Sequence, residues 1–218
     1  MSTTLSSLRS RTRYFLDELA SAGVTWLSAE LNQYINDAEQ WLWSELCKTD
    51  DSFGLREGTA TLVQAQTEYN YPSDMLGRNV RSLYAYTTGT DPQKKVDKGT
   101  YEQVMAEGTS QVEYPYKYCP MDGYFKVGPP PDNSGYTLRI AYTRQPTALS
   151  SDVDVMDSDD EYAALIACQA ALLALTRTGG DKSAIEKEFT KLFDAAFGNT
   201  APDDLLQQSP LWKYKEDI

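Results

Sequence analysis

The stretch of the sequence with the clearest potential for chemistry is the acidic run of residues 151–161, SDVDVMDSDDE, which holds six carboxylates. Carboxylate oxygens are ligands for Ca²⁺ and Mg²⁺, so such a run raises the hypothesis of a metal site. The spacing lacks the central glycine and the terminal bidentate glutamate of a calcium loop. Asp159, Asp160 and Glu161 precede a helical pattern, where the helix dipole stabilises anions. We therefore predict helix capping here and no metal site.

Nucleophilic catalysis finds little support in the sequence. The chain contains no histidine, which excludes Ser-His-Asp and Cys-His systems and histidine-bearing zinc sites. Cys47, Cys119 and Cys168 lack the paired spacing of zinc or redox motifs. A pair of carboxylates, as in glycoside or metal-assisted phosphodiester hydrolysis, stays open as an enzymatic alternative, although 32 acidic residues produce such pairs by chance. We predict no catalytic residue, no bound metal and no cofactor.

A cluster of basic residues lies near the N-terminus, where Arg9, Arg11 and Arg13 fall mostly off the apolar face of a helix predicted over residues 6–20. In one interpretation this is a solvated side on which Arg13 pairs with Asp17, a contact worth a few tenths of a kcal/mol. In the other, the three arginines contact an acidic partner or the phosphates of passing DNA. We favour the first and keep these arginines as a candidate partner-facing or DNA-facing surface.

Further helices are predicted from the apolar periodicity of the sequence. The clearest, residues 28–48, starts at a candidate N-cap, Ser28, with Glu30 in the first turn. Apolar residues recur in it at three- and four-residue steps and form one broad stripe. The stripe consists of Leu31, Tyr34, Ile35, Ala38, Trp41, Leu42 and Leu46. The same reasoning predicts helices over residues 159–178 and 183–197.

Between these helical regions the apolar pattern becomes alternating and turn residues become frequent. Most of the 15 tyrosines lie between Tyr69 and Tyr142, which favours β-structure. We predict short strands over residues 59–66, 69–71, 80–87, 112–118, 124–127 and 136–143. The lysine-bearing residues 91–98 are interpreted as a solvated loop rather than a phosphate site, and residues 101–107 as one or two helical turns.

The order of these periodicities predicts an α+β fold. Two N-terminal and two C-terminal helices form a four-helix bundle from residues 1–50 and 151–198, and residues 51–150 form an inserted antiparallel β subdomain. Residues 199–218 form an extended C-terminal tail, which either folds back on its own domain or docks on another chain. The candidate anchors in this tail are Leu205, Leu206, Leu211, Trp212 and Tyr214.

Composition narrows the classes of partner. The net charge of −12 argues against a surface that grips DNA or anionic lipid by counterion release. An odd number of widely spaced cysteines fits reduced thiols. No apolar run is long enough to span a bilayer, and the N-terminal residues lack the apolar core of a signal peptide. We expect a soluble protein that is made and used without secretion.

The order of several motifs resembles that of head-to-tail adaptor (connector) proteins of tailed bacteriophages. The resemblance covers residues 5–197 and rests on the order of structural motifs rather than on any single one. The helix carrying Ser28, Leu31, Ile35, Asn36, Asp37, Ala38 and Trp41 resembles the second helix of these proteins. Similar counterparts exist for residues 69–75, 80–84, 124–146 and 162–165 and for the Gly-Asp turn at residues 180–181.

This resemblance implies a structural protein of the virion neck, assembled in the host cytoplasm. Such adaptors form a ring, usually of twelve copies, between the portal protein and the tail or nozzle proteins, around the channel through which double-stranded DNA passes. The C-terminal segment of this family commonly inserts against the portal or a neighbouring subunit, which favours docking of the tail through Trp212 and Tyr214. The alternatives are a carboxylate-based hydrolase and a module whose tyrosine-rich sheet binds glycan or peptide.

Overall fold

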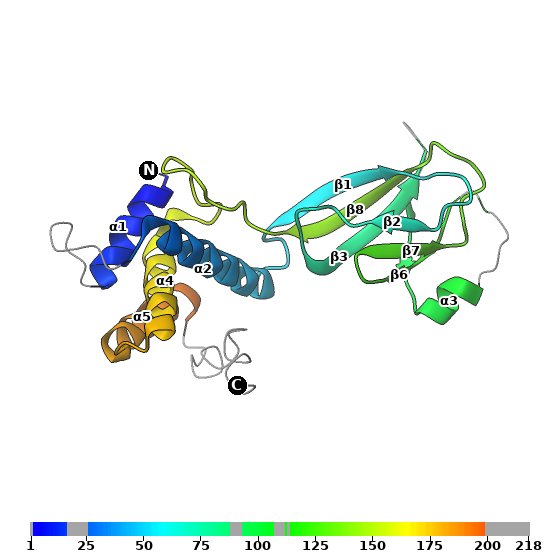
Figure 1. Cartoon of the computed structure of the whole chain (residues 1–218). Helices are drawn as coiled ribbons and strands as arrows, with labels where there is room; N and C mark the ends of the chain where they lie inside the picture. Colours follow the sequence, from blue (N-terminus) through cyan, green and yellow to red (C-terminus); the bar gives the residue numbers. More distant parts are fainter. Residues whose placement is uncertain (1, 17–25, 88–92, 107–111, 113, 199–218) are drawn as a thin grey trace. The chain divides into compact units, whose positions relative to one another are not determined.

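A computed structural model describes the protein over residues 2–16, 26–87, 93–106, 112 and 114–198 (Figure 1). The fold is α+β, as predicted. The chain divides into two compact units. The helical unit comprises residues 1–44 and 146–218, and the β unit comprises residues 45–145.

The described helices of the helical unit follow the predicted order. They are α1 (Leu5–Phe15), α2 (Ser28–Thr49), the 3-10 turn η1 (Asp160–Tyr162), α4 (Ala163–Thr178) and α5 (Ser183–Phe197), and the end of α2 extends into the β unit. The helices predicted over residues 28–48, 159–178 and 183–197 are confirmed within a few residues. The predicted first helix ends earlier than expected, at Phe15, and residues 17–20 lie outside the described part of the chain.

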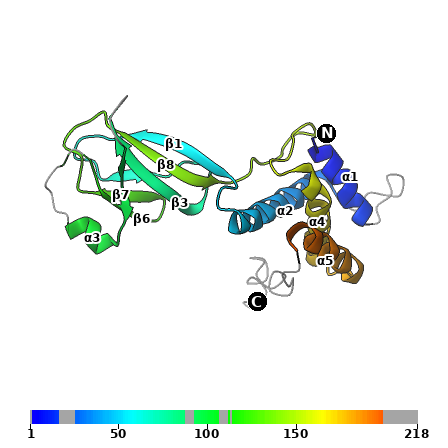
Figure 2. The same cartoon turned by 180° about the vertical axis from the view of Figure 1, so that it is seen from behind.

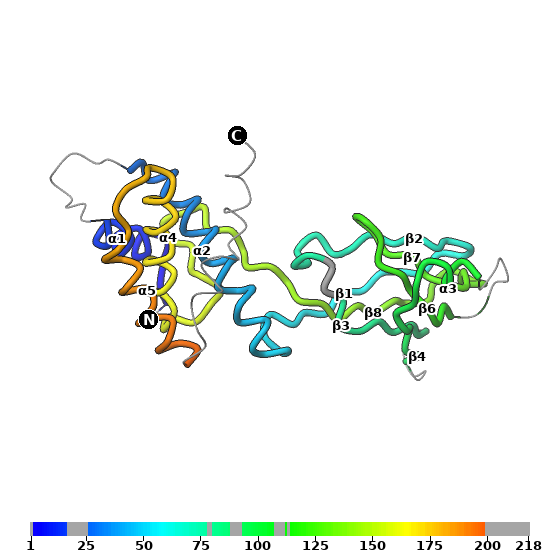
Figure 3. Tube along the Cα trace, turned by 90° about the horizontal axis from the view of Figure 1, so that it is seen from below, coloured from blue at the N-terminus to red at the C-terminus, as the bar shows by residue number. Residues whose placement is uncertain are grey.

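Helix α4 holds the other helices of this unit together. Five of its alanines, among them Ala167, Ala170 and Ala171, are fully buried, so neighbouring backbones can approach it closely. α1 and α5 both pack against it, and both lie next to it in the ribbon seen from behind (Figure 2) and in the trace (Figure 3). On α2, Tyr34 accepts a hydrogen bond from Arg177 of α4 (3.0 Å).

Helix α2 buries most of its predicted apolar stripe, with two corrections. Trp41 is only half-buried, and its ring lies 5.6 Å from that of Phe189 on α5, whereas Trp43, which is not on the predicted stripe, is 2% exposed. Ser28 is the first residue of the helix rather than its cap, because Leu31 donates to the carbonyl of Leu27. Buried Trp43 shows that core contacts surround α2 more widely than the stripe predicted.

The β unit consists of two four-stranded sheets. Their strand orders are β1-β8-β3-β4 and β2-β7-β6-β5, and every pairing is antiparallel except that of β5 with β6. The strands are β1 (Leu55–Thr61), β2 (Glu68–Asn70), β3 (Met75–Tyr86), β4 (Lys94–Lys95), β5 (Asp97–Lys98), β6 (Lys117–Pro120), β7 (Tyr124–Gly128) and β8 (Thr137–Arg144).

Several predicted strand boundaries need correction. The strand expected over residues 59–66 runs over Leu55–Thr61, because its full length pairs with β8. The expected loop over residues 91–98 contains β4 and β5, which are too short to show an alternating pattern. The strand expected over residues 112–118 is limited to β6 and an isolated bridge at Val112.

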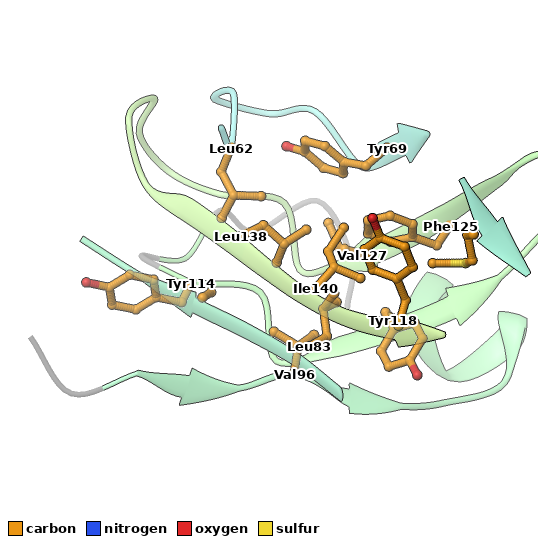
Figure 4. Packing of buried hydrophobic residues seen from close by; sticks show 13 residues of the cluster. Leu62, Tyr69, Leu83, Val96, Tyr114, Tyr118, Phe125, Val127, Leu138 and Ile140 are labelled. Atoms are coloured by element: carbon orange, nitrogen blue, oxygen red, sulfur yellow. The ribbon is translucent and has the colours of Figure 1, made fainter. Parts of the chain in front are cut away.

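The core of the β unit lies between its two sheets (Figure 4). Leu83, Leu138 and Ile140 come from the first sheet, whereas Phe125 and Val127 come from the second. Phe125 is fully buried and its ring contacts those of three tyrosines. These are Tyr69, Tyr71 and Tyr118.

The predicted helical turns at residues 101–107 are confirmed as α3 (Tyr101–Ala106), which packs against β6 and β7. Gly128 permits this close packing. A Cβ atom there would lie 2.8 Å from the carbonyl oxygen of Val104, a distance that no side chain tolerates. Val104 is buried on the side of α3 that faces Gly128 of β7, and the other side of this short helix faces outward.

Candidate interaction surfaces

The acidic run after β8 serves as a hydrogen-bonding framework. Asp154 Oδ2 accepts from the backbone amides of Ser150 and Ser151, both at 2.8 Å, and these bonds hold the pKa of Asp154 below its ordinary value. Asp160 Oδ1 accepts from the amide of Thr3 (2.5 Å), and hydrogen bonding to Thr3 lowers the pKa of Asp160. The carboxylate of Asp160 therefore ties the N-terminal segment to the segment that precedes α4, whereas that of Asp154 closes its own loop.

The predicted capping is only partly right. Asp160 and Glu161 lie in the first turn of η1, where the helix dipole favours anions, and Asp159 is its N-cap residue. The side chain of Asp159 makes no capping hydrogen bond to η1, however, and the carboxylate of Asp160 binds the amide of Thr3. A contact between residues this far apart in sequence carries no local signal, so the sequence could not predict it.

Two polar side chains of α2 belong to the same framework. Asn36 both donates to the carbonyl of Leu149 (3.0 Å) and accepts from its amide (2.7 Å), which imitates the pairing of two strands. Glu39 is 1% exposed, and its Oε1 accepts from the amide of Asp157 (2.8 Å). The resemblance had singled out Asn36, and the structure gives it this bridging contact.

The three N-terminal arginines occupy different environments. Arg9 forms an ion pair with Asp152, and its side chain is only 15% exposed. Arg13 donates from Nη2 to the carbonyl of Trp26 (2.9 Å), and the expected partner Asp17 lies outside the described residues. Arg11 is exposed on α1. The structure thus leaves Arg11 as the arginine of this group that is best exposed for a partner.

A shallow hollow of about 330 Å³ lies beside Arg11. It is lined by Ser7, Ser10, Tyr14 and Phe15 of α1 and by Ala164 of α4. Tyr14 is 78% exposed at its rim. The lining offers apolar contact and one cation, without any carboxylate that could act on a substrate.

The predicted tail anchors lie outside the described residues. They are Leu205, Leu206, Leu211, Trp212 and Tyr214.

Four tyrosines of the β unit are buried in its core. Tyr69, Tyr114, Tyr118 and Tyr142 are each less than 10% exposed. Tyr142 donates to Asp74 Oδ1 (2.7 Å). Burial raises the pKa of Tyr142, and its hydrogen bond to Asp74 adds to the rise. These tyrosines stabilise the unit and do not offer a surface to glycan or peptide.

Two exposed tyrosines and an exposed methionine of the β unit lie on α3 and next to β6. Together with the lysines beside the tyrosine rings, they form what we call the α3 surface, which consists of Tyr101, Met105, Tyr116, Lys117 and Lys126. Tyr101, Met105 and Tyr116 are 43–48% exposed. Lys126 Nζ lies 5.8 Å from the centre of the Tyr101 ring, and Lys117 Nζ lies 5.9 Å from that of Tyr116. Sequence reasoning missed this surface, because the same tyrosine-rich composition predicts core strands.

The geometry offers no sign of catalysis in the described part of the chain. No cluster of three or more histidine, cysteine, aspartate or glutamate side chains in the described ranges is arranged to hold a metal. Burial raises the pKa of the Cys168 thiol to about 12, the opposite of an activated nucleophile. Among the described helices, none has the length and apolar character needed to cross a bilayer.

Comparison with known proteins places the chain in a family. A search among curated proteins found no match. The model of a protein family described as SU10 adaptor protein matches residues 3–211, which is nearly the whole chain. This match confirms the resemblance to phage head-to-tail adaptors. The chain belongs to the SU10 adaptor protein family.

Proposed function

We propose that the protein is a non-enzymatic structural component of a tailed-phage virion, which joins the portal protein to the tail or nozzle proteins at the neck. The family match over residues 3–211 carries this proposal. Copies of the chain form a ring around the DNA channel, with twelve as the expected number. Assembly takes place in the host cytoplasm and involves no membrane.

The distribution of charge supports the passage of DNA without binding. The helical unit carries 19 acidic and 9 basic residues, whereas the β unit carries 13 and 11, so most of the net charge of −12 belongs to the helical unit. A channel wall with an excess of acidic residues repels the phosphates and lets double-stranded DNA slide, because few cations are available to replace the counterions of the DNA. The helical unit is therefore the proposed channel-facing part.

The proposed role assigns a different task to each part of the chain. In the proposed arrangement α1, α2, α4 and α5 act as one four-helix bundle, the β unit projects toward other proteins, and residues 199–218 attach to the portal. Leu205, Leu206, Leu211, Trp212 and Tyr214 are the proposed anchors, since large apolar and aromatic side chains dominate protein interfaces. Arg11 offers a second, cationic contact on α1.

Co-sedimentation of the full chain with purified portal rings tests this function. We expect binding by the full chain, loss of binding on deletion of residues 199–218, and strong weakening by the double substitution Trp212→Ala and Tyr214→Ala. Leu55→Ala, which removes an exposed apolar side chain from β1 of the β unit, away from the α3 surface, is the control and should bind normally. Portal binding that is unchanged by the deletion would contradict the role of the tail.

A further inference from the structure

We propose that copies of this chain contact one another head to tail, with an exposed loop of one helical unit docked on the α3 surface of the next copy's β unit. The loop comprises residues 150–156, and we call it the valine loop. This inference rests on the proposed ring, and it adds to it the two surfaces through which neighbouring copies meet.

The α3 surface has the composition of a docking site. Tyrosine and methionine are enriched in protein interfaces, and Tyr101 and Met105 lie one turn apart on the outward side of α3. The buried Val104 and the close approach at Gly128 hold this helix on the sheet, so its outward residues are fixed in place. A partner would therefore meet a preorganised apolar patch, at little cost in conformational entropy.

The charge around this patch selects an acidic partner. Lys117 and Lys126 lie beside the aromatic side chains, although the Lys126 side chain is only 17% exposed and pairs with Glu68 (3.4 Å). The neighbouring strands β4 and β5 add the exposed Lys94, Lys95 and Lys98, and the exposed acids beside them are Asp97, which pairs with Lys95 (3.1 Å), and Glu102 of α3. β5 pairs directly with β6, which places Lys98 opposite Tyr118 and next to Lys117. An occupant of the patch should thus combine an apolar tip with negative charge.

The valine loop of the helical unit has this combination. Val153 is 76% exposed and Val155 is 45% exposed, values that are unusual for β-branched apolar side chains. Asp152 and Asp154 flank Val153, and the side chain of Asp152 remains 70% exposed although it pairs with Arg9. The loop contains no basic residue.

The valine loop is also held in one conformation. Asp154 closes it through the amides of Ser150 and Ser151, while the backbone carbonyl of Asp154 accepts from Leu5 (2.9 Å). A β-bridge joins Val155 to Thr4. These contacts fix the backbone on both sides of Val153, so its exposed apolar side chain is held in one position. Such a side chain can dock on the apolar patch around α3, which is also fixed in place.

A contact between two different surfaces of identical copies is heterologous. Repeated head to tail, such contacts close into a ring when the rotation between copies permits, which is the arrangement that the proposed function requires. The opposite charges should favour this pairing over contacts between like surfaces, and salt should weaken it.

Disulfide trapping in the full chain tests the inference. We would combine Val153→Cys with Met105→Cys and oxidise the protein on portal rings. The native cysteines Cys47, Cys119 and Cys168 are all buried, so background cross-linking should be low. We expect a ladder of covalent oligomers, whereas an equimolar mixture of the two single variants should stop at covalent dimers.

The matched control replaces Val153→Cys by Leu27→Cys, at another strongly exposed apolar residue of the helical unit, together with Met105→Cys. This variant should remain monomeric on a non-reducing gel. Dimers formed by either single variant alone, or cross-linking of Met105→Cys to the portal, would overturn the inference. If the double variant binds portal rings without forming a ladder, the inference fails while the proposed function stands. Failure of the wild-type chain to bind portal rings would contradict the proposed function instead.

Discussion

The two units of this protein stabilise distant segments by different means. In the helical unit, polar side chains of α2 and of the acidic run bind backbone groups far away in sequence, as in the contacts of Asn36 with Leu149 and of Asp160 with Thr3. In the β unit, strand ladders and a core centred on Phe125 join the segments. Some of the acidic residues in the helical unit therefore have a structural role, because their carboxylates bind backbone amides. A substrate-binding pocket is not needed to account for these residues.

This difference teaches that distant segments are joined mainly by polar side chains in the helical unit, and mainly by strand pairing and an aromatic core in the β unit. Substitutions of polar residues should damage the helical unit, whereas substitutions of aromatic core residues should damage the β unit. Amide hydrogen exchange resolved by peptide can measure the two units separately in the intact chain.

The largest expected effect is that of Phe125→Ala. Removing this fully buried ring leaves a cavity between Tyr69, Tyr71 and Tyr118, which should lower the free energy of unfolding of the β unit by about 3–5 kcal/mol. Exchange should accelerate in the strands while peptides of α4 stay protected. Equal acceleration in α4 would show that the two units unfold together. Tyr116→Ala, at an exposed aromatic residue, is the control and should change little.

Asn36→Ala should have the next largest effect, and it should act on the other unit. The substitution leaves both the amide and the carbonyl of Leu149 without their partner, which typically costs about 1–3 kcal/mol. Thermal unfolding and exchange at residues 146–156 measure the loss. Asn36→Asp retains the acceptor for the Leu149 amide and should be less damaging than Asn36→Ala when ionised. Unchanged exchange in this segment would refute the bridging role of Asn36.

Acid should loosen the N-terminal segment of the helical unit. Because the pKa of Asp154 and of Asp160 is lowered in the folded state, their stabilisation is fully present above their ordinary values and is lost as pH falls through the lowered values. We expect faster exchange, corrected for intrinsic rate, at residues 3–6 as the pH falls through this range. Asp160→Asn should make that segment less sensitive to acid. A variant with the same acid response as wild type would contradict this cause.

The smallest effect is expected for Tyr14→Ala. This side chain is 78% exposed beside the hollow on α1, so its removal should change the free energy of unfolding by no more than about 0.5 kcal/mol. Thermal unfolding provides the measurement. A large loss of stability would mean that Tyr14 packs against the chain in solution, and it would remove α1 from the candidate partner surfaces.

Much of the fold was predictable because its helices bury continuous apolar stripes. Leu31, Ile35 and Leu42 of α2 repeat with helical period, and the period switches to alternation where the β unit begins. The buried Trp43 was missed because it does not fall on the predicted stripe. The strands β4 and β5 were missed because two residues cannot show a period.

The candidate surfaces were far less predictable. The acidic run was noticed for its charge, but its roles depend on Thr3 and on Glu39, which the chain brings close only on folding. Exposed Tyr101 and buried Tyr118 have the same residue type, and only the packing of α3 against β6 distinguishes them. Conversely, the order of weak structural motifs indicated the family, which no single motif could do.

Electron cryomicroscopy of the full chain mixed with portal rings tests the central claim most directly. The account predicts closed rings of this protein stacked coaxially on the portal around an open channel, with the helical units facing that channel. Portal rings that remain bare at concentrations where the chain is folded and in excess would contradict the assignment as a head-to-tail adaptor.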